Sequence, residues 1–298
     1  MDLIEKLIPE SEVVYRPSEP FMATLLENRR LTPEDSIDDI RHLLFDITGS
    51  QINYLEGQSV GILVPGLDER GKRHRVRLYS IASSRSGDDG NSNTITLCIK
   101  RVVYTDEESG EEVRGLASNF VSDAKPGDKI PLTGPTGRRF LLPASDQVNL
   151  VMIAVGTGIA PFRSFINHIY SERGSWGGCV RLFYGAKTGL ESVYMNDKNN
   201  DIGQYYTKNT FQAFQALSRQ ETNTEGERVY VQHKIAQQKE KIWPLVKGGN
   251  LVLYLCGLKS MESGVDQVFA GWATEDGLDW ATIKEELKSS GRWNIEVY

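Results

Sequence analysis

Residues 149–166 read NLVMIAVGTGIAPFRSFI, and this stretch decides the fold of the second half of the chain. Residues 150–155 form a continuous apolar run, as a strand covered on both faces requires, and the residues after Pro161 show helical spacing. Two glycines between them permit a tight turn and let a pyrophosphate approach the backbone. A lone Gly-x-Gly is common, but the order strand, turn, helix indicates a nucleotide site at residues 156–161.

The same alternation continues toward the C-terminus. Strand-like VRLFYG and NLVLYLCG alternate with helical YVQHKIAQQKEKIWPLV and MESGVDQVFAGWA. Such alternation predicts a parallel, doubly wound α/β sheet of Rossmann-like type.

Residues 21–142 show a different sequence pattern, with short apolar runs separated by turn residues. Their alternation and close spacing predict an antiparallel β-barrel or sandwich. The change near Pro143 places a boundary between residues 142 and 148. We therefore expect one domain over residues 1–145, with an arm or tail at 1–20, and a second over 146–298.

Composition excludes several classes of protein. The 298 residues are 39% hydrophobic and 25% charged, as in globular proteins, and the net charge of −6 argues against a nucleic-acid-binding protein. The three cysteines form no Cys-x-x-Cys pair, so no metal site is predicted. The sequence shows no transit or signal pattern and no apolar run of membrane-spanning length, which predicts a cytoplasmic protein without an integral membrane segment.

Two short motifs in the first half are candidate cofactor contacts. In Arg77-Leu78-Tyr79-Ser80, arginine can grip a pyrophosphate and tyrosine offers a plane to a flat cofactor, although ordinary strand residues explain the motif equally well. Ser118 stands near the start of a short predicted helix, where a phosphate could bind or where the serine could act as a helix cap.

The second half holds two further candidates. Ser218, Arg219, Arg228 and Tyr230 supply the hydroxyl, positive charges and aromatic plane that recognition of an adenosine 2′-phosphate needs, although a salt-bridged surface would explain them too. Cys256 ends a predicted parallel strand, where ligands of open α/β sheets bind, although buried thiols usually serve packing alone.

Taken together, these motifs resemble the plant-type ferredoxin–NADP+ reductases. The matching segments are RLYSIASS, LCIKRVVYT, SNF, GTGIAPFRSF, LSRQETNTEGERVYVQ, YLCGLKSME and WNIEVY, in the family's order and spacing. The resemblance runs from about Phe21 to Tyr298. It implies an N-terminal FR-type antiparallel barrel that binds FAD and a C-terminal Rossmann-like domain that binds NADP(H).

The resemblance also implies roles for individual residues. Arg77 would hold the FAD pyrophosphate, Tyr79 would pack on the isoalloxazine, and Tyr104 would stack on the adenine. The other residues expected at the FAD site are Leu78, Ser80, Cys98, Ile99, Lys100, Leu116, Ala117 and Ser118. Those expected to hold NADP are Thr157, Ala186, Lys187, Ser218, Arg219, Arg228, Tyr230, Gly257 and Leu258, with Lys100 reaching the NADP pyrophosphate and Glu296 also counted among the cofactor contacts.

The activity that the resemblance implies is electron transfer between NADPH and a small carrier, ferredoxin or flavodoxin. Hydride would pass between nicotinamide C4 and flavin N5, with Ser80, Cys256 and Glu296 orienting the nicotinamide and Tyr298 covering the flavin face until displaced. The alternatives are an NADPH-dependent reductase component of a multicomponent oxygenase and a non-catalytic nucleotide-binding module.

A basic docking surface for the carrier is expected from the same resemblance, although scattered solubilising charges would explain the residues too. Its candidates are Arg16, Lys72, Arg73, Arg75, Arg138, Arg139, Lys259 and Lys288. The chain departs from the family at Ala117, where a cysteine is common, at Ala186-Lys187, where Val-Pro is common, over residues 191–209, and at Ser289, where a lysine is common.

Overall fold

The computed structural model describes residues 5–7 and 14–298. These residues form two compact units, one of residues 14–138 and the other of residues 139–298 together with residues 5–7. The chain passes from one unit to the other between Arg138 and Arg139.

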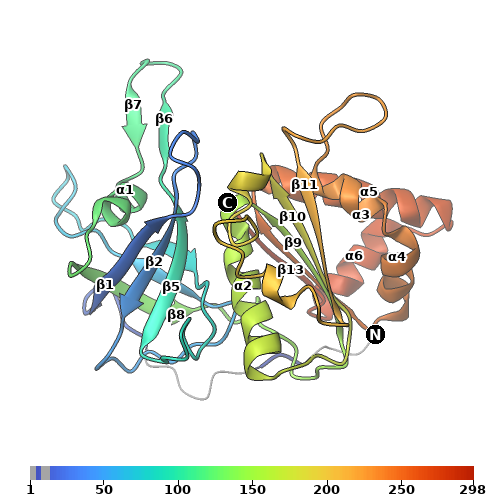
Figure 1. Ribbon diagram of the computed structural model, residues 1–298, viewed down its shortest axis with the longest axis horizontal. Helices are drawn as coiled ribbons and strands as arrows, with labels where there is room; N and C mark the ends of the chain where they lie inside the picture. Colours follow the sequence, from blue (N-terminus) through green and yellow to red (C-terminus); the bar gives the residue numbers. More distant parts are fainter. Residues whose placement is uncertain (1–4, 8–13) are drawn as a thin grey trace. The chain divides into compact units, whose positions relative to one another are not determined.

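The first unit is built on a six-stranded antiparallel sheet with the strand order β4-β3-β8-β1-β2-β5 (Figure 1). Its strands are β1 (Phe21–Arg30), β2 (Ile40–Asp46), β3 (Ser59–Ile62), β4 (Arg77–Ser80), β5 (Thr94–Lys100) and β8 (Lys129–Thr136). Just after β4, Ile81 bridges to Leu97, and the Ala82 N–H donates to the Thr96 carbonyl at 2.8 Å. Because this joins the two ends of the strand order, the sheet closes into a barrel rather than a sandwich.

Alternating apolar residues fill the interior of this barrel. Leu43, Phe45, Ile95 and Leu97 are fully buried on the paired strands β2 and β5. A two-stranded hairpin of β6 (Val103–Thr105) and β7 (Glu112–Arg114) extends away from the barrel, and α1 (Leu116–Asp123) follows it (Figure 1). Residues 106–111, DEESGE, form the turn of this hairpin between the paired residues Thr105 and Glu112.

The second unit contains a five-stranded sheet with the order β11-β10-β9-β12-β13, and every strand pair is parallel. The strands are β9 (Asn149–Val155), β10 (Val180–Ala186), β11 (Phe211–Leu217), β12 (Leu251–Gly257) and β13 (Trp293–Val297). The helices are α2 (Ala160–Asn167), α3 (Val231–Ala236), α4 (Lys239–Gly248), α5 (Lys259–Glu275) and α6 (Trp280–Ser289). The doubly wound α/β architecture is therefore confirmed.

Helices cover both faces of the parallel sheet, with α2 on one face and α3 to α6 on the other (Figure 1). Phe162 and Phe165 of α2 are fully buried, and Phe165 packs edge-on against Tyr254 of β12 with 5.2 Å between ring centroids. On the other face, Phe269 of α5 stacks with Trp280 of α6 at 5.1 Å. Coverage on both faces explains why the strands of this unit are continuous apolar runs.

One predicted helix differs from the structure. Residues 230–246 were expected to form a single helix, but α3 ends at Ala236 and α4 begins at Lys239. The break turns the chain so that α3 packs on β9, β10 and β11 while α4 packs on β12. Both Ile235 and Ile242 are thereby fully buried, since burial of both apolar faces outweighs the continuity of one helix.

The structure describes residues 5–7 of the predicted N-terminal arm. Residues 1–4 and 8–13 lie outside the described residues, whereas the Leu7 N–H donates to the Leu142 carbonyl at 3.1 Å. The Lys6 Nζ donates to the Leu141 carbonyl at 2.9 Å and to the Tyr254 hydroxyl at 2.8 Å. Burial lowers the pKa of the Lys6 amine to about 7. This short segment is therefore docked on the α/β unit.

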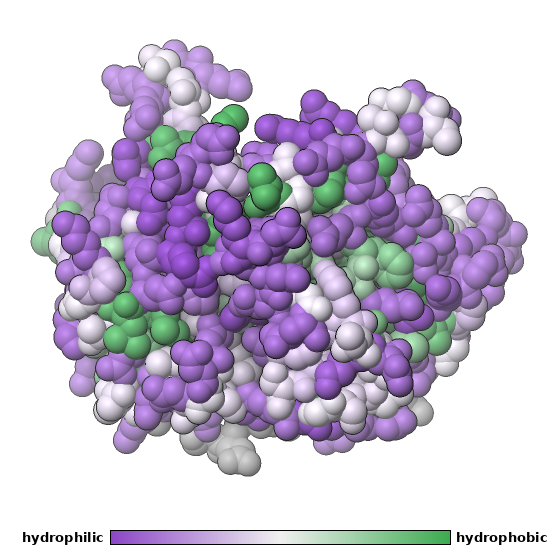
Figure 2. Space-filling model, in the orientation of Figure 1, coloured by the Kyte–Doolittle hydropathy of each residue, from purple (hydrophilic) through white to green (hydrophobic). Residues whose placement is uncertain are grey.

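The surface carries little contiguous apolar area on the face in view, where apolar residues gather in small separate patches among hydrophilic ones (Figure 2). Among residues 5–7 and 14–298, no helix combines the length and the apolar character needed to cross a membrane.

The turn after β9 lies against the end of β12. A 3₁₀ turn, Gly156–Ile159, links β9 to α2. A Cβ placed on Gly158 would lie 2.0 Å from the Cys256 carbonyl oxygen and 2.9 Å from the Gly257 amide nitrogen. Only a residue without a side chain permits this approach, so the glycine brings the turn against the residues predicted to bind the nicotinamide.

Replacing Gly158 by alanine should therefore destabilise the α/β unit by about 1–3 kcal/mol, because the added methyl group meets backbone atoms that cannot rotate away. All five tryptophans lie between residues 176 and 293, so tryptophan fluorescence during urea unfolding reports on this unit alone. Gly271→Ala in α5 is the control, since a Cβ there meets nothing within 4 Å. An unchanged unfolding midpoint for Gly158→Ala would contradict the steric argument.

Candidate functional site

The predicted pyrophosphate contact, Arg77, lies at the start of β4 and is exposed. Its guanidinium makes no hydrogen bond or ion pair with residues 5–7 or 14–298. Leu78 beside it is 61% exposed, which is unusual for a leucine within a strand. Tyr79 is partly buried against the barrel core, and this burial raises the pKa of its hydroxyl to about 12 despite the opposing charge of Arg77.

The end of β5 presents one of its three predicted FAD contacts to solvent. Cys98 and Ile99 are 4% and 1% exposed. Ile99 packs in the barrel core, whereas Cys98, as its neighbour in the strand, is buried on the opposite face of the sheet. Lys100 is exposed, and its ammonium forms an ion pair with Asp38 at 2.7 Å. The lysine is therefore held beside the barrel, with nearly half of its side chain accessible.

The hairpin and α1 hold the remaining predicted FAD contacts. Tyr104 on β6 is 54% exposed and Leu116 at the start of α1 is 52% exposed, whereas Ala117 is buried. Ser118 does not cap the helix, because the residue at the cap position is Gly115 and no side chain caps it. The first turn of α1 thus keeps backbone N–H groups that no carbonyl of its own helix accepts.

These features fit FAD. The ligand joins two flat apolar ring systems through a doubly charged pyrophosphate. The first unit offers exposed apolar and aromatic side chains at Leu78, Tyr104 and Leu116, a cation at Arg77 and the N-terminus of a helix.

In the second unit, parallel pairing brings the carboxyl ends of β10 and β11 together. The Ser218 N–H donates to the Ala186 carbonyl at 3.0 Å, and the Arg219 N–H donates to the Lys187 carbonyl at 2.9 Å. The segment after β11 then turns back, since Arg228 bridges to Thr222. The predicted 2′-phosphate residues therefore belong to one looped segment beside β10.

Tyr230 ends this segment. It is 45% exposed, and its ring lies 6.1 Å from that of His233. The ring is therefore available as a plane for adenine, as the residue pattern indicates.

The C-terminal residues meet the glycine turn at the end of β12. Cys256 pairs with Glu296 in the β12–β13 register, and the Tyr298 N–H donates to the Gly257 carbonyl at 3.0 Å. The Tyr298 hydroxyl shares a hydrogen bond of 2.5 Å with the Thr157 hydroxyl. Three of the four predicted catalytic residues are thus gathered at one end of the sheet, while Ser80 is the last residue of β4 in the other unit.

Three residues at this end of the sheet differ in accessibility. Cys256 is 2% exposed, whereas Leu258 is 50% exposed and Tyr298 is 65% exposed. The exposed ring of Tyr298 thus lies at the protein surface, fixed at its hydroxyl by Thr157.

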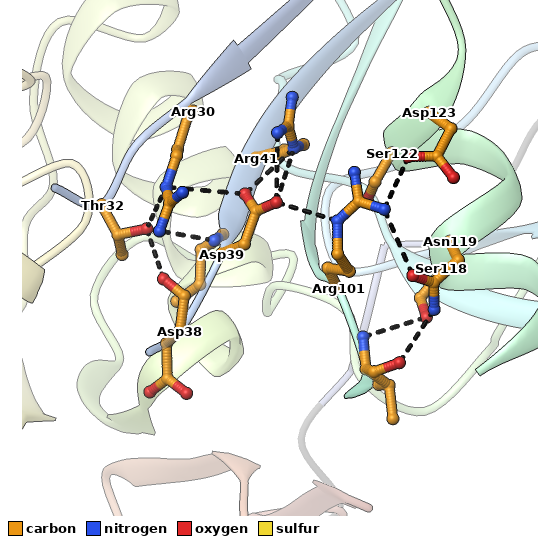
Figure 3. Close-up of polar contacts among 12 residues, drawn as sticks. Arg30, Thr32, Asp38, Asp39, Arg41, Arg101, Ser118, Asn119, Ser122 and Asp123 are labelled. Atoms are coloured by element: carbon orange, nitrogen blue, oxygen red, sulfur yellow. Dashed lines mark hydrogen bonds and ion pairs between the residues drawn. The ribbon is translucent and has the colours of Figure 1, made fainter. Parts of the chain in front are cut away.

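Sequence reasoning assigned no role to Arg101 and Asn119, which form a polar network at the base of the hairpin (Figure 3). Both stand inside segments that carry the family resemblance, directly after Lys100 and Ser118. Their position next to predicted FAD contacts could have marked them as candidates. Their spacing along the chain gave no indication that Arg101 and Asn119 contact each other.

Family models match both halves of the chain. The model of the oxidoreductase FAD-binding domain matches residues 31–140, and that of the oxidoreductase NAD-binding domain matches residues 152–267. The first lies mainly on the barrel unit and the second lies wholly on the α/β unit.

Similar proteins carry one consistent name. Ferredoxin–NADP reductase, leaf isozyme 1, chloroplastic, of Oryza sativa subsp. indica is 42% identical over 287 residues, which is 95% of this chain and 78% of that protein. Ferredoxin–NADP reductase of Synechocystis sp. is 40% identical over 96% of this chain and 69% of that protein. The solved ferredoxin–NADP+ reductase of Plasmodium falciparum has a TM-score of 0.73 and 27% identity, with both chains fully covered. The chain therefore belongs to the ferredoxin–NADP reductase family.

Proposed function

We propose that this chain is a flavoenzyme that transfers electrons between NADPH and a one-electron carrier protein, ferredoxin or flavodoxin. Its cofactors are FAD and NADP(H), as the two matched domains indicate. The observation that carries the proposal is the gathering of Thr157, Cys256, Glu296 and Tyr298 at the carboxyl end of β12. A module that only bound a nucleotide would need no such cluster.

The barrel unit holds FAD in this proposal. Arg77 binds the pyrophosphate together with N–H groups of the first turn of α1, and Tyr79 and Tyr104 provide surfaces for the two ring systems. When bound, FAD supplies the conversion between hydride transfer and single-electron transfer. Cys98 and Ile99 contribute through backbone atoms, because both side chains are buried.

The looped segment after β11 gives preference for NADPH over NADH. Arg219 and Arg228 supply positive charge to the 2′-phosphate, Ser218 supplies a hydroxyl, and the exposed ring of Tyr230 supplies a plane for adenine. Neither position 218 nor position 219 carries an acidic residue, and an acidic residue there would favour NADH.

Tyr298 controls access of the nicotinamide in this proposal. Its ring and the nicotinamide compete for one place beside Cys256, so the hydrogen bond to Thr157 must break before the nicotinamide binds. Contacts at the 2′-phosphate end offset this loss, because binding energy from a remote part of the substrate can support the reacting geometry. Cys256 and Glu296 then orient the nicotinamide.

The carrier protein docks on basic side chains. All eight candidates, Arg16, Lys72, Arg73, Arg75, Arg138, Arg139, Lys259 and Lys288, are exposed. Because ferredoxins are acidic, complementary charge would accelerate encounter, and salt would weaken the effect.

For the compartment we propose the cytoplasm. The described cysteines, Cys98, Cys179 and Cys256, are free thiols, which is compatible with a reducing environment. Several plant relatives are named chloroplastic, so fractionation of the source cells, with the protein recovered from an organelle fraction, would contradict this assignment.

The purified protein should be yellow and should reduce ferricyanide much faster with NADPH than with NADH. Cytochrome c reduction should depend on added ferredoxin and should fall as ionic strength rises. Without bound flavin and without NADPH oxidation the proposal would fail. Ferricyanide reduction with no response to either ferredoxin or flavodoxin would favour the oxygenase-reductase alternative.

Tyr298→Ser should raise kcat/KM for NADH by about tenfold or more, because a ring that obstructs the nicotinamide is removed and each tenfold corresponds to about 1.4 kcal/mol. Tyr298→Phe is the matched control: it keeps the ring and removes only the hydroxyl that meets Thr157. Steady-state kinetics with both coenzymes measure the change. If Tyr298→Ser discriminated against NADH as strongly as the natural protein does, Tyr298 would not have the proposed role.

A further inference from the structure

The β6–β7 hairpin carries a predicted adenine contact but lacks a core of its own. All three residues of β6 are exposed, and so are two of the three residues of β7. An isolated two-stranded hairpin is marginally stable in water. Tyr104 can therefore hold a fixed position only if the base of the hairpin is anchored to the rest of the barrel unit.

The anchor is the backbone of Val102, immediately before β6. Its carbonyl accepts from the Gly115 N–H at 2.9 Å and from the Asn119 side-chain amide at 2.8 Å. Its N–H donates to the Ser118 hydroxyl at 3.1 Å. Both polar groups of one residue are thus held by the start of α1, so hairpin and helix are fixed to each other.

Arg101 connects this joint to the barrel. Its Nε donates to the Asp39 carboxylate at 2.9 Å, and its Nη1 donates to Asp123 at 2.6 Å and to the Asn119 side-chain oxygen at 3.2 Å (Figure 3). Its backbone N–H also donates to the Asp39 carbonyl at 2.8 Å. One largely buried side chain, 15% exposed, therefore links the segment before β2 to the middle of α1 at Asn119 and to its last residue, Asp123.

Asp39 is fixed in turn by arginines of the barrel strands. The Nε and Nη2 of Arg41 donate to its Oδ2 at 3.1 Å, and the Nε of Arg30 lies 3.7 Å from its Oδ1 (Figure 3). Burial opposes ionisation of Asp39, but the hydrogen bonds from Arg41 and Arg101 outweigh it and hold the pKa of the carboxyl below its usual range. The acceptor for Arg101 is therefore a charged and oriented group.

The far end of α1 is held by the same strands. The Asn28 side-chain amide of β1 donates to the carbonyls of Ser122 and Ala124 at 3.0 and 2.7 Å. Its oxygen accepts from Arg41 at 3.1 Å. The helix is thus fastened to the barrel by side-chain hydrogen bonds from Asn28 at its C-terminal end and from Arg101 at Asn119 and Asp123.

We propose that Arg101 and Asn119 are positioning residues for FAD, which hold the hairpin with Tyr104 and the first turn of α1 in the arrangement that the adenine and pyrophosphate end of the cofactor needs. This inference rests on the proposed FAD site. Neither side chain need touch the cofactor, since both act through Val102 and α1.

Arg101→Lys tests the proposal. Lysine keeps the charge but cannot contact Asp39 and α1 together, because it lacks the planar fork of donors. We expect the dissociation constant of FAD, measured from the fluorescence of cofactor released on dilution of the holoenzyme, to rise about tenfold, as expected for loss of one charge-assisted hydrogen bond. Lys129→Gln is the control, since the Lys129 Nζ on β8 hydrogen-bonds to the Thr24 hydroxyl of the paired strand β1.

Hydrogen exchange separates positioning from general destabilisation. In Arg101→Lys, amides of residues 102–119 should exchange faster while those of β1, β2 and β5 keep their protection. Asp123→Asn, at the exposed end of the network, should give a smaller change of the same kind. This second variant keeps the proposal testable if Arg101→Lys fails to fold.

Unchanged FAD affinity, or faster exchange throughout the barrel to the same extent, would overturn the proposal. A natural protein that binds no FAD would instead refute the proposed function. In that case, unaltered exchange in residues 102–119 of the variant would show separately that the network does not hold the hairpin.

Discussion

The arrangement of the α/β unit depends on the absence of a side chain at Gly158. The turn after β9 lies against the backbone at the end of β12, at a distance that a methyl group would block. Because of this approach, Thr157 reaches the C-terminal Tyr298, and Cys256 and Glu296 lie beside the same turn. Parallel pairing alone would bring the strand ends to one edge, but the close turn is what places a hydroxyl within bonding distance of the last residue.

In the barrel unit, the candidate FAD contacts are supported in two different ways. Its candidate FAD contacts lie partly on a strand of the closed sheet and partly on a hairpin and helix outside it. The strand residues Arg77 and Tyr79 are fixed by backbone pairing with β3. The outer residues rely on polar side chains instead, because the hairpin buries almost no apolar surface. Partly buried charges at Asp39 and Arg101 supply directed bonds that apolar packing could not give.

These two kinds of support suit the proposed reaction. In the proposed function, coenzyme choice depends on a looped segment with exposed arginines and an exposed tyrosine. The residues proposed to orient the nicotinamide lie on paired strands and beside a short turn, where position is set before any ligand binds. Rigid placement at the reacting end and accessible charge at the remote end are what a mechanism that uses remote binding energy requires.

The sequence by itself determined the two fold classes and the strand, helix or turn to which most candidate residues belong. Short continuous apolar runs such as residues 150–155 are typical of strands covered on both faces, and glycines after such a strand indicate a nucleotide turn. These patterns are local, so they can be recognised without coordinates. The family resemblance rests on the same local segments, and relatives about 40% identical over nearly the whole chain bear it out.

Only the tertiary structure decided which residues meet. Arg101 and Asp39 are 62 residues apart in sequence, and no periodicity relates them. The closure of the barrel through Ile81 and Leu97, the break between α3 and α4, and the contact between Thr157 and Tyr298 likewise depend on long-range packing. A local pattern fixes the conformation of a segment, whereas these contacts follow from how distant segments bury their apolar faces and satisfy their polar groups together.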